Sequence, residues 1–242
     1  MAKTVRWLTF VLVFGLFFAG CQEKVKKPEV SPTMTPTAVA KDQIKLPEPQ
    51  KAGKVSLEET IQKRRSRRDF TDRPLTLAQI SQILWAAQGI TEEATGFRAA
   101  PSAGALYPLE VYVVAKEKGV EGLEAGVYRF IPEGHLLQVH QKGDIHQDFV
   151  AACLNQEACD LAPVSLVITA VYERTTEKYG ERGRRYVEIE VGHVGQNVYL
   201  QAEALGLGTC AIGAYNDEEV ARILNLPKEH EPLYIMPLGY PK

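Results

Sequence analysis

The sequence predicts an α+β domain, in which helices flank several strands. Apolar runs of the fully buried type, such as 109–115 and 164–171, indicate strands. Apolar residues at helical spacing, as in 77–87, indicate helices. The two kinds of element do not alternate strictly, which disfavours a sheet built from βαβ units. With 242 residues and 45% hydrophobic content, the chain can bury one ample core.

Local signals place the individual elements. Ser56 and Glu59 have the spacing of a capping box and predict a helix that runs towards Lys63. Asp217 is expected to cap a helix through Leu224. Further helices are expected at 77–87, 145–154 and 184–205, and strands at 109–115, 127–131, 136–140, 164–171 and 233–239, with a short strand after Gly206. Two stretches, 91–100 and 172–185, are expected to be polar loops.

A basic cluster follows the first predicted helix. Four arginines and Ser66 fall within residues 64–68. A guanidinium presents a rigid fork of donors that matches phosphate oxygens, and serine adds a hydroxyl donor. A formal net charge of −2 argues against general nucleic-acid binding, so the cluster favours a small anionic ligand. A solvated basic face is the simpler alternative.

The N-terminus has the organisation of an export signal. Lys3 and Arg6 precede an apolar run over 7–18, which is short for a bilayer span. The segment that ends at Cys21 resembles a bacterial lipobox, with Phe18 where leucine is usual. The resemblance implies a signal peptide over 1–20, a lipid on Cys21 and an exported, membrane-anchored lipoprotein on the periplasmic or extracellular face. An uncleaved anchor or a chance apolar terminus remains the alternative.

Residues 21–53 are predicted to form a disordered tether. The segment has five prolines among polar residues and little apolar periodicity, so it cannot offset its ordering entropy by burial. The folded domain is accordingly expected over 54–242. Its cysteines, Cys153, Cys159 and Cys210, are odd in number and lack a Cys-x-x-Cys pair, so we expect buried thiols without a disulfide framework or zinc site. If Cys153 and Cys159 share one helix, they face different directions.

Several chemical motifs lack support. There is no Gly-x-Gly-x-x-Gly or Gly-x4-Gly-Lys-Ser/Thr cradle, and no Gly-x-Ser-x-Gly elbow. Glu190 and His193 have helix-face spacing, but a di-iron bundle needs a second such pair, so no metal is predicted. His193 is instead expected to be a hydrogen-bonded core or interface histidine. Gly192 and Gly195, inside the longest predicted helix, indicate close approach of another helix or a ligand.

The stretch 101–108 is a candidate platform for a planar ring. Two prolines bracket small residues there, which predicts an irregular, constrained backbone that a ligand can approach closely. A strand begins immediately after it.

Five motifs in order carry a family resemblance. They are RRSRRDF (64–70), PSAGALYP (101–108), KYGERGRRY (178–186), VGHVGQN (191–197) and LGLGTCAIGAY (205–215). Together they resemble the nitroreductase superfamily and, within it, the SagB/ThcOx-type FMN-dependent oxidoreductases, over residues 56–240. The resemblance implies a nitroreductase-like fold with a central, mostly antiparallel sheet flanked by helices. It also implies a homodimer that binds two FMN molecules at its interface.

The resemblance also implies which residues contact FMN. Arg64, Arg65, Ser66 and Arg68 match the motif on the phosphate and ribityl chain, whereas Arg67 is expected to face solvent. Pro101, Ser102, Ala103, Gly104 and Leu106 match the loop that contacts the isoalloxazine from the partner subunit. Ala211, Ile212, Gly213 and Ala214 match the turn whose backbone lies against the ring, and many family members have glutamate in place of Gly213. Beyond the last strand only Lys242 stands where a basic residue usually closes on the phosphate, and we expect it to fray.

Lys178 and Tyr179 match the pair that serves azoline oxidation in the SagB-like branch, as proton acceptor and orienting group. A lysine near other cations, or partly desolvated, suits a general base. An exposed pair in a charged loop is the alternative. The implied function is FMN-dependent hydride transfer to or from a small organic substrate, by azoline-type oxidation or nitro or quinone reduction. The rivals are a non-catalytic flavin- or ligand-binding surface lipoprotein and, with less support, a flavin-fragmenting enzyme.

Overall fold

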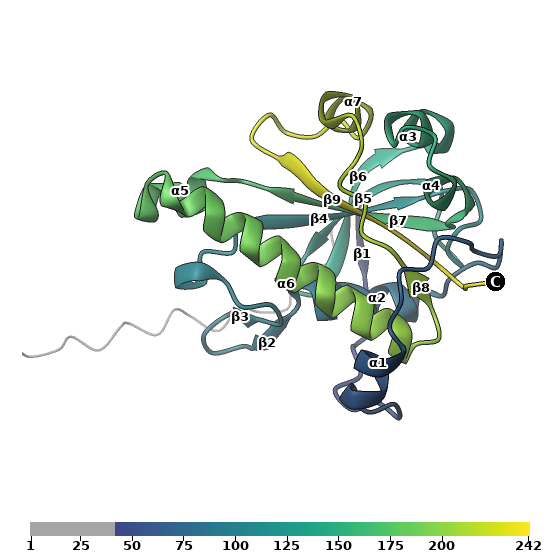
Figure 1. Cartoon of the computed structure of the whole chain (residues 1–242), viewed down its shortest axis with the longest axis horizontal. Helices are drawn as coiled ribbons and strands as arrows, with labels where there is room; N and C mark the ends of the chain where they lie inside the picture. The colour runs from purple at the N-terminus through teal and green to yellow at the C-terminus, as the bar shows by residue number, and fades with distance from the viewer. Residues whose placement is uncertain (1–41) are drawn as a thin grey trace, which may run out of the picture. The chain divides into compact units, whose positions relative to one another are not determined.

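A seven-stranded sheet in the order β1-β6-β5-β4-β7-β9-β8 lies at the centre of the described part of the chain (Figure 1). The computed structural model describes residues 42–242. Every strand pair of this sheet is antiparallel, which confirms the predicted α+β class. The strands are β1 (Gln43–Lys45), β4 (Leu109–Ala115), β5 (Gly126–Ile131), β6 (Leu136–Lys142), β7 (Val164–Ala170), β8 (Gly208–Thr209) and β9 (Glu231–Gly239).

Helices cover both faces of the sheet. They are α1 (Leu57–Lys63), α2 (Leu77–Gln88), α3 (His146–Ala152), α4 (Glu157–Leu161), α5 (Glu173–Tyr179), α6 (Arg182–Ala204) and α7 (Asp217–Ile223). Side chains of β4 alternate between two cores, so Val113 packs with α2 and α6 while Tyr112 packs with α3, α4 and α7. Because both faces are covered, β4 and β7 are buried at every position, as their continuous apolar runs predicted.

The caps of three helices explain their starts. Ser56 accepts a hydrogen bond from the Glu59 amide at 3.1 Å, as the capping-box spacing predicted, while the Glu59 carboxylate pairs with Lys63 instead. Thr76 begins α2 with a complete capping box. At α7 the prediction was wrong by one residue, because the Asn216 side chain accepts from the Glu219 amide.

Three predicted regions differ in the structure. The expected loop 91–100 contains a two-stranded hairpin, β2 (Ile90–Glu92) with β3 (Phe97–Arg98). The expected loop 172–185 holds α5 and the first turn of α6. The expected helix 145–154 ends at Ala152, because Leu154 and Asn155 take positive φ values, and α4 follows separately.

The N-terminal boundary also differs. The tether was predicted to reach residue 53, but β1 pairs with β6, and Leu46 is only 2% exposed in the core. The Leu46 amide donates to the His135 carbonyl at 3.2 Å. Two apolar side chains, Ile44 and Leu46, therefore order a segment that proline content alone marked as disordered. The predicted signal peptide, Cys21 and the tether up to residue 41 lie outside the described residues.

The three predicted buried cysteines are free thiols in the second core. Cys153 caps α3 and Cys159 lies in α4, so they do not share one helix as considered above. The hydrogen bond with the neighbouring Cys153 thiol, and then burial, raise the pKa of Cys159, which keeps it protonated and unreactive. Within residues 42–242, no helix is long and apolar enough to cross a bilayer.

Candidate functional site

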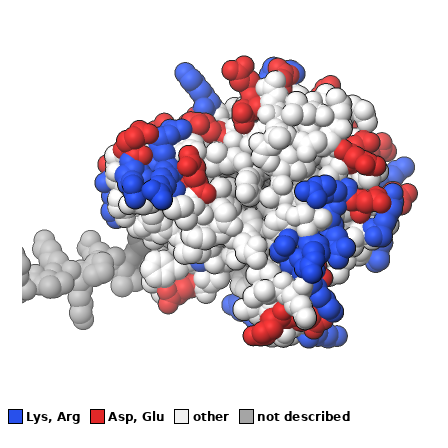
Figure 2. All heavy atoms as spheres, in the orientation of Figure 1, with Lys and Arg blue, Asp and Glu red and all other residues white. Residues whose placement is uncertain are grey.

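The basic cluster runs beside strand β8, far from it in sequence. Ser66 forms a parallel bridge with Thr209, and the Arg67 amide donates to the Thr209 carbonyl at 2.9 Å. The cluster therefore extends the edge of the sheet that β8 forms. Figure 2 shows Lys and Arg side chains gathered over the end of α1 and β8 on this face. These contacts place the cluster next to the predicted flavin turn, which follows β8 directly.

The four arginines of the cluster have different surroundings. The Arg64 guanidinium lies 5.0 Å from the centre of the Tyr199 ring. Arg65 donates to the carbonyls of Gln62 and Arg64, at 3.0 and 2.7 Å, and so caps the end of α1. Arg67 is exposed, as expected. Arg68 is also exposed, and its charge counteracts the burial that raises the pKa of Cys210 to about 11. Arg64 therefore lies beside Tyr199, and Arg68 lies close enough to Cys210 for its charge to act on that thiol.

Tyr199 of α6 joins the cluster to the turn. Its hydroxyl oxygen lies 3.0 Å from the Ser66 hydroxyl and accepts a hydrogen bond of 2.7 Å from the Ala211 amide. Sequence reasoning missed this residue. The available signal was its position four residues after Gly195 on the same helix, but its partners are 133 and 12 residues away in sequence.

The turn over 211–214 is fixed by its backbone. Ile212 exchanges two backbone hydrogen bonds with Ile235 of β9, at 2.8 and 3.0 Å, and its side chain is buried. The Ala214 carbonyl accepts a hydrogen bond of 2.7 Å from the side-chain amide of Gln156. A side chain at Gly213 would meet no atom within 4 Å, so the turn leaves open space there. The turn therefore exposes backbone and small side chains, because Ile212 is buried while Gly213 and Ala214 are exposed.

The predicted platform loop and the Lys-Tyr pair lie together. A Cβ atom at Gly104 would come within 2.8 Å of the Tyr179 hydroxyl and 2.9 Å of the Lys178 ammonium. Gly104 has φ +65°, and the neighbouring Ala105 and Tyr107 also have positive φ values. The pair sits in the last turn of α5 and not in a loop, but Lys178 is exposed, as the alternative expected, and Tyr179 is half-buried. Tyr179 makes an edge contact with Tyr186 of α6 at 5.2 Å.

Side-chain hydrogen bonds hold the platform loop in this conformation. The Tyr107 amide donates to the Ser102 hydroxyl at 2.9 Å. Arg174 of α5 donates to the Tyr107 carbonyl at 3.1 Å and to Glu110 of β4 at 2.6 Å. The loop is therefore tied both to the helix that carries Lys178 and to a central strand.

A buried carboxyl group lies behind the platform loop. Glu190 of α6 is 1% exposed, and its Oε1 atom has no hydrogen-bond partner among the described residues. Burial raises the pKa of Glu190 to about 7, although Ser102, Gln88 and the Arg98 charge counteract part of the shift. The sequence had suggested Glu190 only as a weak metal ligand with His193. His193 is exposed in the single chain, so the expected core position is wrong and the interface position stays a prediction, and no group of three potential metal ligands gathers within residues 42–242.

The two groups of candidate residues lie near opposite ends of α6. Tyr199 marks one group and Tyr186 the other, and thirteen residues of helix separate them by about 20 Å. In Figure 1, α5 lies at one end of α6, and α1 and β8 lie at the other. One chain therefore brings the basic cluster to the flavin turn and the platform loop to the Lys-Tyr pair, but does not bring these two groups together.

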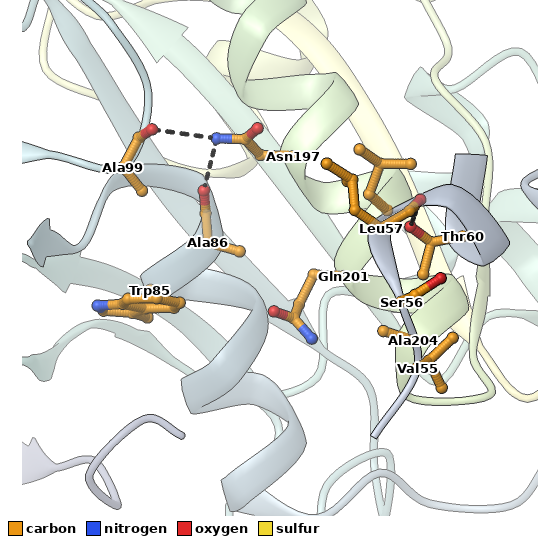
Figure 3. Close-up of a pocket in the computed structure, with 11 residues that line it drawn as sticks. Val55, Ser56, Leu57, Thr60, Trp85, Ala86, Ala99, Asn197, Gln201 and Ala204 are labelled. Atoms are coloured by element: carbon orange, nitrogen blue, oxygen red, sulfur yellow. Dashed lines mark hydrogen bonds between the residues drawn. The ribbon is translucent and has the colours of Figure 1, made fainter. Parts of the chain in front are cut away.

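A groove of about 340 Å³ lies between α1, α2 and α6 (Figure 3). Asn197 lines it and donates to the carbonyls of Ala86 and Ala99, at 3.0 and 3.4 Å. Of the two α6 glycines that the sequence singled out, Gly195 faces the molecule's own sheet, where a Cβ would lie 3.3 Å from Tyr234. Gly192 has nothing within 4 Å of its Cβ position. Only Gly192 therefore remains open to an approaching partner.

Comparison with known proteins agrees with the fold and the motifs. Residues 61–240 match the Nitroreductase family, and the chain therefore belongs to this family of flavin-binding oxidoreductases. A protein of Methanocaldococcus jannaschii named as a nitroreductase, MJ1384, is 49% identical over 185 residues, which cover 76% of this chain and 91% of that protein. A nitroreductase-like structure from Ralstonia eutropha has a TM-score of 0.70 at 30% identity, and the match covers 88% of this chain and 97% of that one.

A further relative is named for the processing of microcin B17. The microcin B17-processing protein McbC of Escherichia coli is 29% identical over 172 residues, which cover 65% of this chain. This chain spans 60% of the length of McbC. The relationship agrees with the SagB-like branch that the motifs indicated.

The raised pKa of Glu190 predicts a pH-dependent stability. In the unfolded chain this carboxyl ionises near its usual pKa, whereas in the folded chain it keeps its proton up to about pH 7. The contribution of this carboxyl group to the free energy of unfolding is therefore fully present below about pH 4.5 and is lost as the pH rises towards 7. We expect the wild-type protein to lose roughly 2 kcal/mol relative to Glu190→Gln between about pH 5 and pH 8.

Chemical denaturation at both pH values measures this difference. Glu188→Gln is the matched control, because Glu188 is exposed on the same helix and the variant keeps Glu190, so it should show the same pH dependence as the wild type. Equal pH dependence in wild type and Glu190→Gln would show that Glu190 is ionised in the folded protein.

Proposed function

We propose that this protein is an FMN-dependent oxidoreductase that works as a homodimer, with each FMN held between two copies. The observation that carries the proposal is the arrangement at the two ends of α6. A basic cluster is joined to a backbone turn at one end, and a Lys-Tyr pair lies against a glycine platform at the other. Bound FMN would supply the two-electron chemistry by which a hydride passes to or from a substrate.

The residues at the first end fit a phosphate group. Arg64 and Arg68 offer guanidinium donors and Ser66 a hydroxyl, all beside the turn at Ala211. Arg65 adds positive charge, although its guanidinium is engaged with carbonyls of α1. Lys242 was expected to fray, but it is held in place. Its ammonium pairs with Asp69 at 2.9 Å, and its backbone amide donates to the Asp69 carbonyl. The cluster itself therefore supplies the charge for the phosphate.

The second end fits the flavin ring and the reacting group. Pro101, Ser102, Ala103, Gly104 and Leu106 would face the ring from the partner copy, opposite the backbone of residues 211–214. Lys178 would accept a proton from the substrate, and Tyr179 would orient it. Both lie where a side chain at position 104 would stand, so they border the platform directly. The similarity to McbC supports azoline-type oxidation, and the wider family supports nitro or quinone reduction.

A dimer is required because one chain separates the two groups by about 20 Å along α6. A two-fold axis across α6 would bring the first end of one copy beside the second end of the other. The surface offers apolar contacts for such pairing, since Leu57, Ile61 and Ile189 are 59%, 56% and 48% exposed. The groove beside Leu57 and the open position at Gly192 lie on the same helices.

The location is a separate part of the proposal. Residues 1–21 support export and lipid anchoring through Cys21, and cell fractionation tests this part, since a protein found with the soluble fraction would contradict it. The rival function is a flavin-binding lipoprotein without turnover. FMN binding without activity on nitroaromatic, quinone or azoline substrates would favour that rival.

The phosphate assignment predicts the effect of removing Arg68. Loss of a charge-assisted hydrogen bond should raise the Kd for FMN in Arg68→Ala by about 10- to 100-fold, and Arg64→Ala should behave alike. Titration of apoprotein with FMN, followed by flavin fluorescence, measures the change. The matched control is Arg222→Ala, because Arg222 only pairs with Glu219 on the surface of α7. Wild-type affinity in both cluster variants would contradict the assignment.

The platform assignment predicts the effect of a methyl group at position 104. Gly104→Ala should lower the rate of azoline oxidation at saturating FMN by at least about tenfold, because it displaces Lys178 and Tyr179. Gly96→Ala separates this clash from backbone strain, since Gly96 has φ +72° but open space around it. Equal rates in the two variants would show that the Lys-Tyr pair does not act in this reaction.

A further inference from the structure

We propose that Tyr199 is a positioning residue that orients the Ser66 hydroxyl towards the FMN phosphate. It also ties the loop of the basic cluster, residues 64–68, to the flavin turn over 211–214. The inference rests on the proposed FMN site and concerns a residue that lies outside all five sequence motifs. Three contacts of Tyr199 carry it: the Ala211 amide, the Ser66 hydroxyl and the Arg64 guanidinium.

The direction of the two hydrogen bonds follows from the inventory of donors. The Ala211 amide can only donate, so the Tyr199 oxygen accepts from it at 2.7 Å. The phenol then still has its own proton, and the Ser66 oxygen lies 3.0 Å away to accept it. If Tyr199 donates to Ser66, the Ser66 proton points elsewhere. Ser66 is exposed, so its proton is available to a phosphate oxygen.

The aromatic ring of Tyr199 has a role separate from that of its hydroxyl. The Arg64 guanidinium lies 5.0 Å from the ring centre, within the range of a cation–π contact. The ring thus restrains one cation of the cluster, and the hydroxyl restrains the serine. Among the described residues, the loop also meets the turn region through backbone contacts of Ser66 and Arg67 with Thr209 and through Phe70, which lies in the same core cluster as Cys210 and Ile212. Beside these contacts, Tyr199 supplies a hydrogen-bonded side-chain link between loop and turn.

This arrangement predicts a specific dependence on the phosphate. Tyr199→Phe keeps the ring, and with it the contact to Arg64, but removes the hydroxyl that orients Ser66. FMN carries a phosphate and riboflavin does not. The substitution should therefore weaken FMN binding more than riboflavin binding, whereas general damage to the turn would weaken both.

The experiment titrates full-length apoprotein with FMN and with riboflavin. We expect Tyr199→Phe to raise the Kd for FMN by about tenfold, the effect of losing one hydrogen bond to a charged group, and the Kd for riboflavin by less than about threefold. Ser66→Ala should reproduce this pattern. The Kd of the double variant for FMN should lie within about twofold of that of Ser66→Ala, because the two side chains act through one contact.

Tyr128→Phe is the matched control. Its hydroxyl also makes one hydrogen bond, to the Glu124 carbonyl at 2.8 Å, at a place remote from the site in the fold. It should leave both Kd values unchanged. Thermal unfolding compares the stability of the Tyr199→Phe and Tyr128→Phe apoproteins. If Tyr199→Phe does not fold, Ser66→Ala tests the phosphate dependence, because Ser66 is exposed.

Three results would overturn the inference. They are wild-type FMN affinity in Tyr199→Phe, equal losses for FMN and riboflavin, and additive losses in the double variant. Tighter FMN binding in Tyr199→Phe would also overturn it, since Tyr199 would then compete with the ligand for Ser66. Failure of the proposed function is distinguishable, because the wild-type protein would then bind neither flavin.

Discussion

The close packing of α6 on the sheet is the constraint on which the rest of the structure depends. At Gly195 the helix approaches β9 so closely that a Cβ would lie 3.3 Å from Tyr234. This contact sets the height of a 23-residue helix over the sheet. It thereby aligns Glu190 behind the platform loop, Asn197 with carbonyls of α2 and the following loop, and Tyr199 with the basic cluster. One helix thus positions elements that are far apart in the sequence.

The length of α6 also underlies the proposal that two copies share each flavin. A helix that carries one group of ligands near each end cannot bring them to one flavin within a single chain. Two helices related by a two-fold axis can, and each pairing then produces two equivalent sites. The apolar side chains exposed on α1 and α6 suit this pairing better than they suit solvent. Fold, surface and chemistry are therefore consistent with the same assembly.

Much of the fold was predictable because its signals are local. Buried strands β4 and β7 are continuous apolar runs, and α2 has both a capping box and helical periodicity. The misses have physical causes. Helix α5 buries only Thr175, so it has no apolar face to detect, and β1 relies on two isolated apolar residues among prolines. The motifs indicated the candidate residues, but the role of Tyr199 depends on contacts with Ser66 and Ala211 that only tertiary structure creates.

The central claim is that each flavin is held between two copies of this chain. Size-exclusion chromatography with light scattering and flavin absorbance tests it most directly, because mass and flavin content are read from the same peak. The account predicts that FMN elutes with the dimer mass, at about one flavin per copy. A monomer that retains stoichiometric FMN would contradict the account, since the site would then lie within one chain.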